Sequence, residues 1–149
     1  MGYQYLAKQG VDSKALKKLV INRDKTVERM MDKNQGLSKA DAKHIINTLI
    51  TGGHKDYNKL KYKPTLLKNA FEEYKTYKQV FPDNNPRYKE HVEAKNKDKW
   101  KNVEGKVAAH VLQALENNCV QIIDAYLTSK GYDVDVLVYD GVMVSKKKQ

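Results

Sequence analysis

The spacing of the apolar residues changes once along this chain, and the change restricts the folds that the chain can adopt. From residue 13 to residue 129, apolar side chains recur at the three- and four-residue intervals of helical faces. After Gly131 the period becomes two, in the β-branched runs DVDVLVY (133–139) and VMVS (142–145). The dipeptide Asp140-Gly141 between these runs favours a tight hairpin turn. The sequence therefore predicts an α+β protein, predominantly α-helical, with one C-terminal β-hairpin.

Capping and helix-breaking residues predict where the first helices begin and end. One helix is expected over 13–32, with Ser13 as its N-cap. A second helix is expected to begin at Ser38, because Ser38 and Asp41 have the spacing of a capping box. It should end at Gly52-Gly53, since glycine continues a helix poorly and readily adopts the positive φ of a helix end.

The later helices are predicted in the same way. Pro64 suits the first position of a helix, whereas the PDNNP sequence at 82–86 has the composition of a turn. The lysine-rich stretch 87–102 is expected to be a short exposed helix or a loop. The longest helix should cover 103–129 and end at Gly131. The residues of this helix expected to face inward are Val107, Val111, Leu115, Cys119, Ile122, Ile123 and Tyr126.

The length of 149 residues suits one domain. We expect that domain to comprise helices over 1–62, a helical or looped insertion over 63–102, and a long helix with the hairpin over 103–149. No apolar run approaches the roughly 20 residues of a membrane span, so no membrane partner is expected. One cysteine, Cys119, forms no internal disulfide, and no Cys/His set has zinc spacing. An intracellular, reducing location is therefore expected.

The positive charge of the chain lies mainly in its first two thirds. The net charge is +10, and residues 1–62 carry 13 Lys and Arg against 6 Asp and Glu, whereas residues 103–149 carry 5 against 6. A basic surface beside an acidic one would suit a polyanion at the first and a divalent metal ion at the second. The plainer explanation is that excess lysine serves solubility.

Asp140 is the first candidate functional residue, because the hairpin would present its carboxylate at an exposed tip. Such a carboxylate can bind Mg²⁺, which prefers oxygen ligands and often shares its coordination shell with substrate phosphates. Asp133 and Asp135 precede it by several residues and make poor partners for the same ion. Alternatively, Asp140-Gly141 is present only because a type I′ turn requires positive φ angles.

A second group of candidates lies on the helix that begins at Ser38. Lys39, Lys43, Asn47 and Thr51 follow one another in steps of four, which places them along one polar stripe. Two ammonium groups one turn apart can bind a triphosphate. A solvated lysine face would give the same pattern.

A third polar stripe is expected on the long helix. Its members are Gln113, Glu116, Asn117 and Asp124. Such stripes commonly form the solvent-facing side of an amphipathic helix, and a binding surface is the alternative.

Taken in order, these motifs resemble the fingers and palm of family A DNA polymerases. Motif B of that family, Arg-x3-Lys-x7-Tyr-Gly, is similar in spacing to Lys39-x3-Lys43-x7-Thr51-Gly52. Motif C, a hydrophobic hairpin with His-Asp-Glu at its tip, resembles VLVYDGVMV, and Gln113 lies where the family has a glutamine. The closer resemblance is to diverged A-type palm domains of viruses and mobile elements, through LVINRDK, ADAKHIINTLITGG and LVYDGVMV.

The resemblance implies a role for each matching residue. Lys43 would bind the triphosphate of a dNTP and protonate the leaving pyrophosphate, and Lys39 would hold the outer phosphates. Asn47 would lie near the nascent base pair, Thr51 would occupy the position of the motif B tyrosine, and Asp140 would bind Mg²⁺. Gln113 would contact primer-template DNA.

Departures from the family pattern limit what this resemblance implies. Gly141, Tyr139 and Thr51 replace the motif C glutamate, the motif C histidine and the motif B tyrosine, and no strand with the motif A aspartate is present. Since one carboxylate does not hold two metal ions, the chain alone should lack polymerase activity in DNA replication. It would be a fragment or subunit completed by a separate polypeptide carrying motif A, in the host cytoplasm if the protein is viral.

Two other classes of function fit the same residues. The chain could be a non-catalytic, basic DNA-binding or interaction protein derived from a polymerase, which would bind DNA but not a magnesium–dNTP complex. It could also be a helical protein-interaction module in which the motif matches arise by chance, and it would then bind neither.

Overall fold

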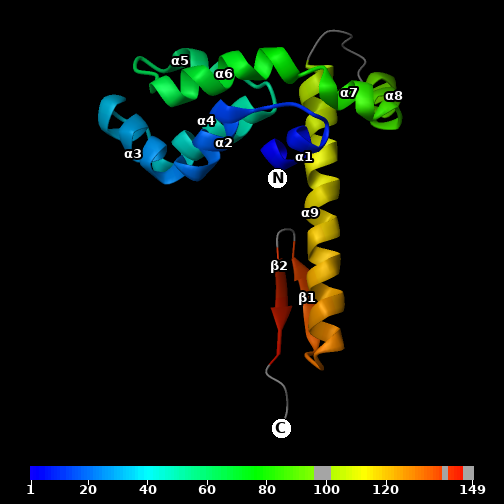
Figure 1. Ribbon diagram of the computed structural model, residues 1–149. Helices are drawn as coiled ribbons and strands as arrows, with labels where there is room; N and C mark the ends of the chain where they lie inside the picture. Colours follow the sequence, from blue (N-terminus) through cyan, green and yellow to red (C-terminus); the bar gives the residue numbers. More distant parts are fainter. Residues whose placement is uncertain (96–101, 139–140, 146–149) are drawn as a thin grey trace. The chain divides into compact units, whose positions relative to one another are not determined.

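Helices form most of the described chain, and the strands come at its C-terminal end (Figure 1). The computed structural model describes residues 1–95, 102–138 and 141–145. The predicted α+β fold, predominantly helical with a C-terminal β-hairpin, is confirmed. In chain order the elements are α1 (Gly2–Lys8), α2 (Lys14–Ile21), α3 (Arg23–Lys33), α4 (Lys39–Ile50), α5 (Lys55–Lys59), α6 (Thr65–Tyr77), α7 (Val80–Asn84), α8 (Pro86–Lys95), α9 (Val103–Ser129), β1 (Val134–Val138) and β2 (Gly141–Val144).

The chain divides into two compact units, and the boundary between them falls within α9. One unit is Gly2–Ala109, which we call the helical unit. The other consists of Met1 and His110–Gln149, which we call the hairpin unit.

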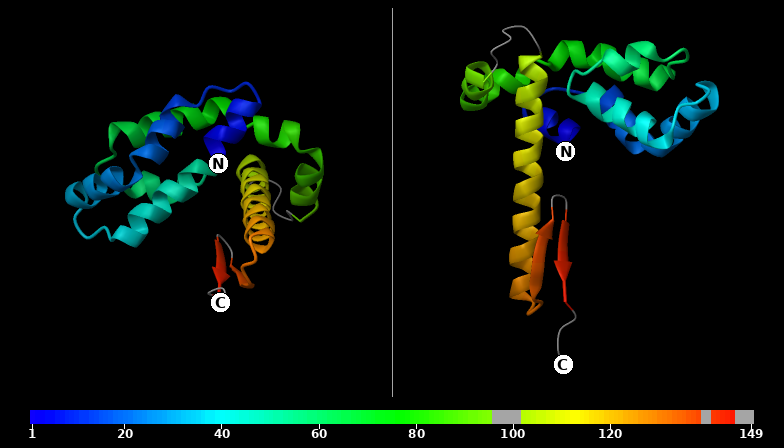
Figure 2. Two further views of the ribbon diagram at one scale, coloured as in Figure 1. Left: turned by 60° about the horizontal axis from the view of Figure 1, so that its bottom comes forward. Right: turned by 180° about the vertical axis from the view of Figure 1, so that it is seen from behind.

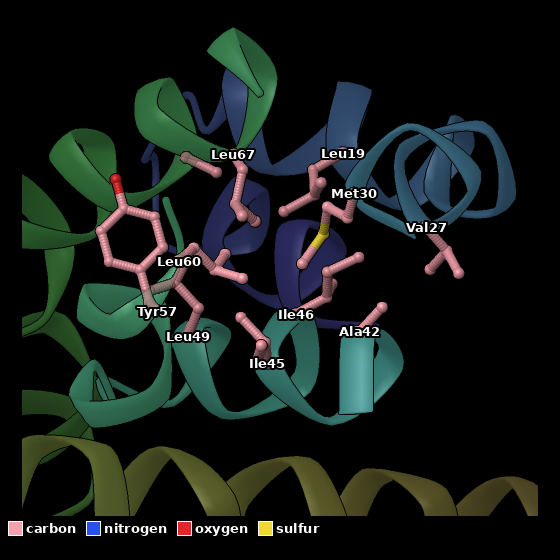
Figure 3. Close-up of a cluster of buried hydrophobic side chains, with 11 residues drawn as sticks. Leu19, Val27, Met30, Ala42, Ile45, Ile46, Leu49, Tyr57, Leu60 and Leu67 are labelled. Atoms are coloured by element: carbon pink, nitrogen blue, oxygen red, sulfur yellow. The ribbon is translucent and has the colours of Figure 1, made fainter. Parts of the chain in front are cut away.

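The core of the helical unit forms where the apolar faces of α2, α3, α4 and α6 meet (Figure 3). Leu19, Met30, Ile46 and Leu67, one from each of these helices, are almost completely buried. Complete burial of such side chains stabilises the fold by about 1.5–3 kcal/mol each. The full cluster comprises Leu19, Val27, Met30, Ala42, Ile45, Ile46, Leu49, Tyr57, Leu60, Leu67 and Ala70.

The single helix predicted over 13–32 is wrong, because the chain breaks at Asn22 into α2 and α3. The Asn22 side chain donates a hydrogen bond to the Lys18 carbonyl at 2.9 Å, and the Asn22 carbonyl accepts one from the Thr26 hydroxyl at 2.9 Å. Asparagine side chains compete in this way with helical backbone bonds. The break places Arg23 at the start of a new helix.

The capping of α2 also differs from expectation. Ser13 occupies the N-cap position as predicted, but its side chain accepts no cap hydrogen bond. Instead, the Glu73 carboxylate of α6 accepts hydrogen bonds from the backbone N–H groups of Ala15 and Leu16, at 3.0 and 2.8 Å. A carboxylate at this position pairs two N–H groups that lack helical partners and interacts favourably with the helix dipole.

The turn predicted at 82–86 is also wrong. Pro82 lies in the first turn of α7, where proline is tolerated, and Pro86 begins α8. Tertiary contacts hold this segment in helical form. The Phe81 ring stacks on the Tyr5 ring with centroids 5.3 Å apart, and Asn85 donates a hydrogen bond to the Tyr5 hydroxyl at 2.7 Å. The exposed helix considered for 87–102 is present as α8, and residues 96–101 lie outside the described part.

The predicted bounds of α9 are confirmed, and Gly131 follows its end with a φ of 76°. The predicted inward face is confirmed only at its beginning. Val107 and Val111 are buried and Leu115 is half-buried, but Cys119, Ile122, Ile123 and Tyr126 are exposed. The prediction is wrong for these four residues, because no element of the described chain covers this side of α9.

The C-terminal hairpin has the predicted strands, and β1 lies beside the second half of α9 in two opposite views (Figures 1 and 2). Its antiparallel register pairs Val134 with Val144 and Val136 with Met143, with an irregularity between Val134 and Val136. Within the described residues the sheet has these two strands. Apolar side chains on both of its faces, including Val136 and Leu137, are exposed.

Candidate nucleic-acid interface

The site begins with the local structure of α4. The predicted N-cap at Ser38 is confirmed, since the Asp41 backbone N–H donates to the Ser38 hydroxyl oxygen at 3.0 Å. The Asp41 carboxylate accepts from the Ser38 hydroxyl at 2.6 Å, in place of the backbone N–H that a capping box would use. At the other end, Thr51 is the C-cap and Gly52 has a φ of 82°. These caps fix where α4 begins and ends.

The polar stripe predicted on α4 is present. Ala42, Ile45, Ile46 and Leu49 bury the opposite face. Along the stripe, Lys39 and Asn47 are exposed and Lys43 is half-buried. Among the described residues, no ion pair or hydrogen bond engages either lysine side chain, so both ammonium groups are free for an anion.

Arg23 adds a third cation to this stripe. Its Nη2 donates a hydrogen bond to the Asn47 side-chain oxygen at 2.9 Å. Asn47 therefore positions the guanidinium group of α3 against α4. We call Lys39, Lys43, Asn47 and Arg23 the cationic ridge, which extends about 12 Å along α4 from Lys39 to Asn47 at 1.5 Å per residue.

Sequence reasoning did not single out Arg23 as a site residue. Arg23 was expected in the middle of one long helix, and the sequence pattern there did not indicate a hydrogen-bond partner for its side chain. The signal was Asn22 immediately before it, since asparagine favours helix ends over helix interiors. The Nε of Arg23 is buried and has no hydrogen-bond partner in the described residues.

Thr51, the last candidate on the stripe, lies where α4 meets the beginning of α9. Its hydroxyl donates to the Thr48 carbonyl at 3.1 Å, and its own carbonyl accepts a hydrogen bond from the Asn102 side chain at 2.9 Å. The Asn102 side-chain oxygen in turn caps α9 by accepting from the Gly105 N–H at 3.0 Å. A Cβ at Gly105 would collide with the Thr51 carbonyl oxygen. The structure therefore gives Thr51 a role in joining these two helices.

A buried tyrosine completes this junction. The Tyr74 hydroxyl lies against Gly52 and is buried without a hydrogen-bond partner in the described residues. Burial, with a smaller contribution from the charge of Glu104, raises the pKa of Tyr74 to about 12. Tyr74 therefore stays neutral at physiological pH and acts as a packing residue beneath the end of α4.

The remaining candidates lie on the C-terminal part of the chain. Gln113 is half-buried on the part of α9 that belongs to the hairpin unit, whereas the cationic ridge belongs to the helical unit. In the same stripe Glu116 is half-buried, and the Asp124 carboxylate accepts a 3.5 Å hydrogen bond from Thr128. Asp140 and Tyr139 lie outside the described residues.

The Mg²⁺ site expected at Asp140 stays a prediction. Among the described residues, no group of three or more His, Cys, Asp or Glu side chains is arranged to hold a metal ion. Asp133 and Asp135 are exposed near the start of the hairpin, and Asp135 accepts a 3.5 Å hydrogen bond from Ser145. Ammonium and guanidinium groups, such as those of the ridge, are able to bind anions without a metal ion.

Comparisons with known proteins provide no relative for this chain. No protein family, curated protein or solved structure matches it. None of the helices in the described part of the chain is long and apolar enough to cross a membrane.

Proposed function

We propose that the helical unit binds the phosphate groups of nucleic acid through the cationic ridge. The observation that carries this proposal is the hydrogen bond from Arg23 to Asn47, because it fixes a guanidinium group on the helix that displays Lys39 and Lys43. A guanidinium has five N–H donors in a planar fork, and phosphate oxygens accept from such forks in pairs.

The unpaired state of the lysines supports the same function. Surface lysines that serve only solubility are commonly interspersed with acidic partners, as Lys59 is with Asp56 and Lys75 is with Glu72 in this chain. Lys39 and Lys43 have no such partner among the described residues, and Arg23 of α3 is hydrogen-bonded to Asn47 of the same helix. Binding DNA would release the counterions that these groups and the phosphates hold in solution.

The resemblance to family A polymerases suggests a narrower function. In that proposal Lys43 and Lys39 bind the triphosphate of a dNTP, Asp140 binds its Mg²⁺, and primer-template DNA is the second substrate. Mg²⁺ and the lysines would neutralise the charge that develops during nucleotidyl transfer. Catalysis would require a partner polypeptide that carries the motif A aspartate.

The hairpin unit supports the existence of such a partner. Ile122, Leu137 and Met143 are 68%, 52% and 58% exposed. Two-stranded sheets are marginally stable alone, and an unpaired strand edge is a template for a further strand. An added strand would both extend the sheet and cover apolar surface.

Salt-dependent DNA binding tests the broader proposal. The probe is a fluorescein-labelled duplex with a recessed 3′ end, measured by fluorescence anisotropy. The double variant Lys39→Ala/Lys43→Ala should bind about tenfold more weakly, and the slope of log affinity against log salt should fall by roughly two. The matched control is Lys17→Ala/Lys68→Ala, which removes two exposed lysines of α2 and α6. Equal losses in both variants would show that net charge, and not the ridge, determines affinity.

Nucleotide binding distinguishes the narrower proposal from a non-catalytic DNA-binding protein. Titration with dATP and Mg²⁺ should show binding that Lys43→Ala and Asp140→Asn each weaken while the circular dichroism spectrum is unchanged. DNA binding without Mg-dATP binding would support the non-catalytic alternative. Primer extension on mixing with a polypeptide that carries a metal-binding aspartate on a strand would support the polymerase function.

A further inference from the structure

A pocket separate from the cationic ridge opens between the end of α3, the loop that follows it, α4 and α5. Its volume is about 760 Å³, within the range of small-molecule sites. Asp41, His44 and Ile45 line it from α4, about half a turn away from Lys39 and Lys43. No residue of the ridge contributes to its lining.

The acidic groups of this pocket are already engaged. The Asp41 carboxylate accepts a hydrogen bond from the Ser38 hydroxyl at 2.6 Å, and Asp56 accepts one from Lys59 at 2.7 Å. The hydrogen bond and the charge of Lys59 lower the pKa of Asp56, and the charges of His44 and Lys55 lower it further. Each carboxylate therefore already has a hydrogen-bond donor within the protein.

The side-chain amide of Asn34, in the pocket wall, also makes its hydrogen bonds within the protein. The buried Asn34 side chain donates to the Met30 carbonyl at 2.9 Å and to the Tyr62 carbonyl at 3.0 Å, and it accepts from the Tyr62 N–H at 3.0 Å. These three bonds use most of the capacity of one amide. Asn34 therefore fixes the segment after α3 against the segment after α5, and it shapes the pocket wall without serving a ligand.

Two lysines and three apolar residues of the pocket have side chains without a hydrogen bond or ion pair within the described protein. Lys33 and Lys61 are exposed, and no hydrogen bond or ion pair of the described residues engages their ammonium groups. The apolar lining comes from Leu37, Ile45 and Leu60, and the last two belong to the buried core (Figure 3). Two free cations beside an apolar surface suit a molecule that has an anionic head and an apolar body.

We propose that this pocket binds a small organic anion, a phosphate monoester or carboxylate with an aromatic or aliphatic body. Lys33 and Lys61 would bind the anionic head in charge-assisted hydrogen bonds. Leu37, Ile45 and Leu60 would contact the body and remove its surface from water. His44 would add a ring nitrogen to the polar side of the site.

Titration with phenyl phosphate, followed by amide NMR shifts of ¹⁵N-labelled protein, tests this site. We expect saturable shifts at Gly36, His44 and Lys61, and tighter binding than that of inorganic phosphate or phenol. Lys33→Ala/Lys61→Ala should weaken binding about tenfold, since charge-assisted bonds contribute more than neutral ones. Both lysines are exposed, so the variant should keep its fold.

The matched control is Lys17→Ala/Lys68→Ala, which removes the same charge from exposed positions outside both this pocket and the ridge and should leave phenyl phosphate affinity unchanged. Three results would overturn the proposal. These are the absence of saturable shifts, equal weakening in both double variants, and inorganic phosphate binding as tightly as phenyl phosphate, which would mean that the apolar lining contributes nothing.

Discussion

The helical unit and the hairpin unit carry similar apolar patterns but bury them to very different extents. Ile46 on α4 is 1% exposed, whereas Ile122 on α9 is 68% exposed, although both lie on a helical face of the expected spacing. In the helical unit, α2, α3, α4 and α6 supply apolar faces to one another. The comparison teaches that a helical period identifies the apolar side of a helix, and that neighbouring elements decide whether that side is covered.

The two units also differ in how their polar groups are used. In the helical unit, Glu73 caps a helix 57 residues away in sequence, and Asn34 links two loops. The feature that distinguishes the hairpin unit is apolar: side chains of both strands and of α9 are exposed within the described residues. Long-range polar contacts therefore connect the elements of the helical unit, whereas much of the apolar surface of the hairpin unit is exposed.

Truncation of one side chain in each unit gives the largest expected contrast. Leu49 is 2% exposed, and Leu49→Ala should lower the free energy of unfolding by about 2–5 kcal/mol, because it removes buried surface and leaves a cavity. The matched Ile122→Ala should change it by less than about 0.5 kcal/mol. Urea unfolding followed by circular dichroism measures both. A large loss in Ile122→Ala would show that α9 is covered in solution by self-association, which sedimentation would detect.

Glycine substitution sharpens the contrast within the helical unit. Gly52 and Gly36 have the same φ of 82°, but a Cβ at Gly52 meets Tyr74 and Asn102, while one at Gly36 meets nothing within 4 Å. Gly36→Ala should cost about 1–2 kcal/mol of unfolding free energy from backbone strain alone. Gly52→Ala should cost about 1–3 kcal/mol more from overpacking. Combination with Tyr74→Phe should recover part of that difference, and equal costs at both glycines would contradict the tight junction.

Alkaline pH should also lower the stability of the protein, through a buried tyrosine of the helical unit. Since the pKa of Tyr74 is raised from 10 to about 12, the folded state binds the phenolic proton more tightly than the unfolded state. The free energy of unfolding should therefore fall as the pH rises from 10 to 12. Tyr74→Phe should make this decline shallower. Part of the decline should remain in this variant, because burial also raises the pKa values of Tyr57 and Tyr77.

The matched variant for this measurement is Tyr126→Phe, at an exposed position on α9. It should leave the alkaline decline as in the unsubstituted protein. Urea midpoints across this pH range compare the variants. Identical profiles for Tyr74→Phe and the unsubstituted protein would show that the Tyr74 hydroxyl is hydrated in solution.

The sequence predicted part of the candidate site and missed the rest for a physical reason. Lys39, Lys43 and Asn47 were found because their spacing repeats along one helix. Arg23 was missed because its contact with Asn47 joins residues 24 positions apart. The pocket was missed for the same reason, since Lys33, Ile45 and Lys61 come from separate segments.

The sequence by itself determined the features that depend on near neighbours in the chain. These are the capped start of α4, the glycine after α9, the strand pair, and the side of each helix that is apolar. Only the tertiary structure decided that Glu73 caps α2, that 82–84 are helical, and that the end of α9 stays exposed. Caps and periods act over three or four residues, whereas burial depends on which distant segments meet, and no local pattern records that.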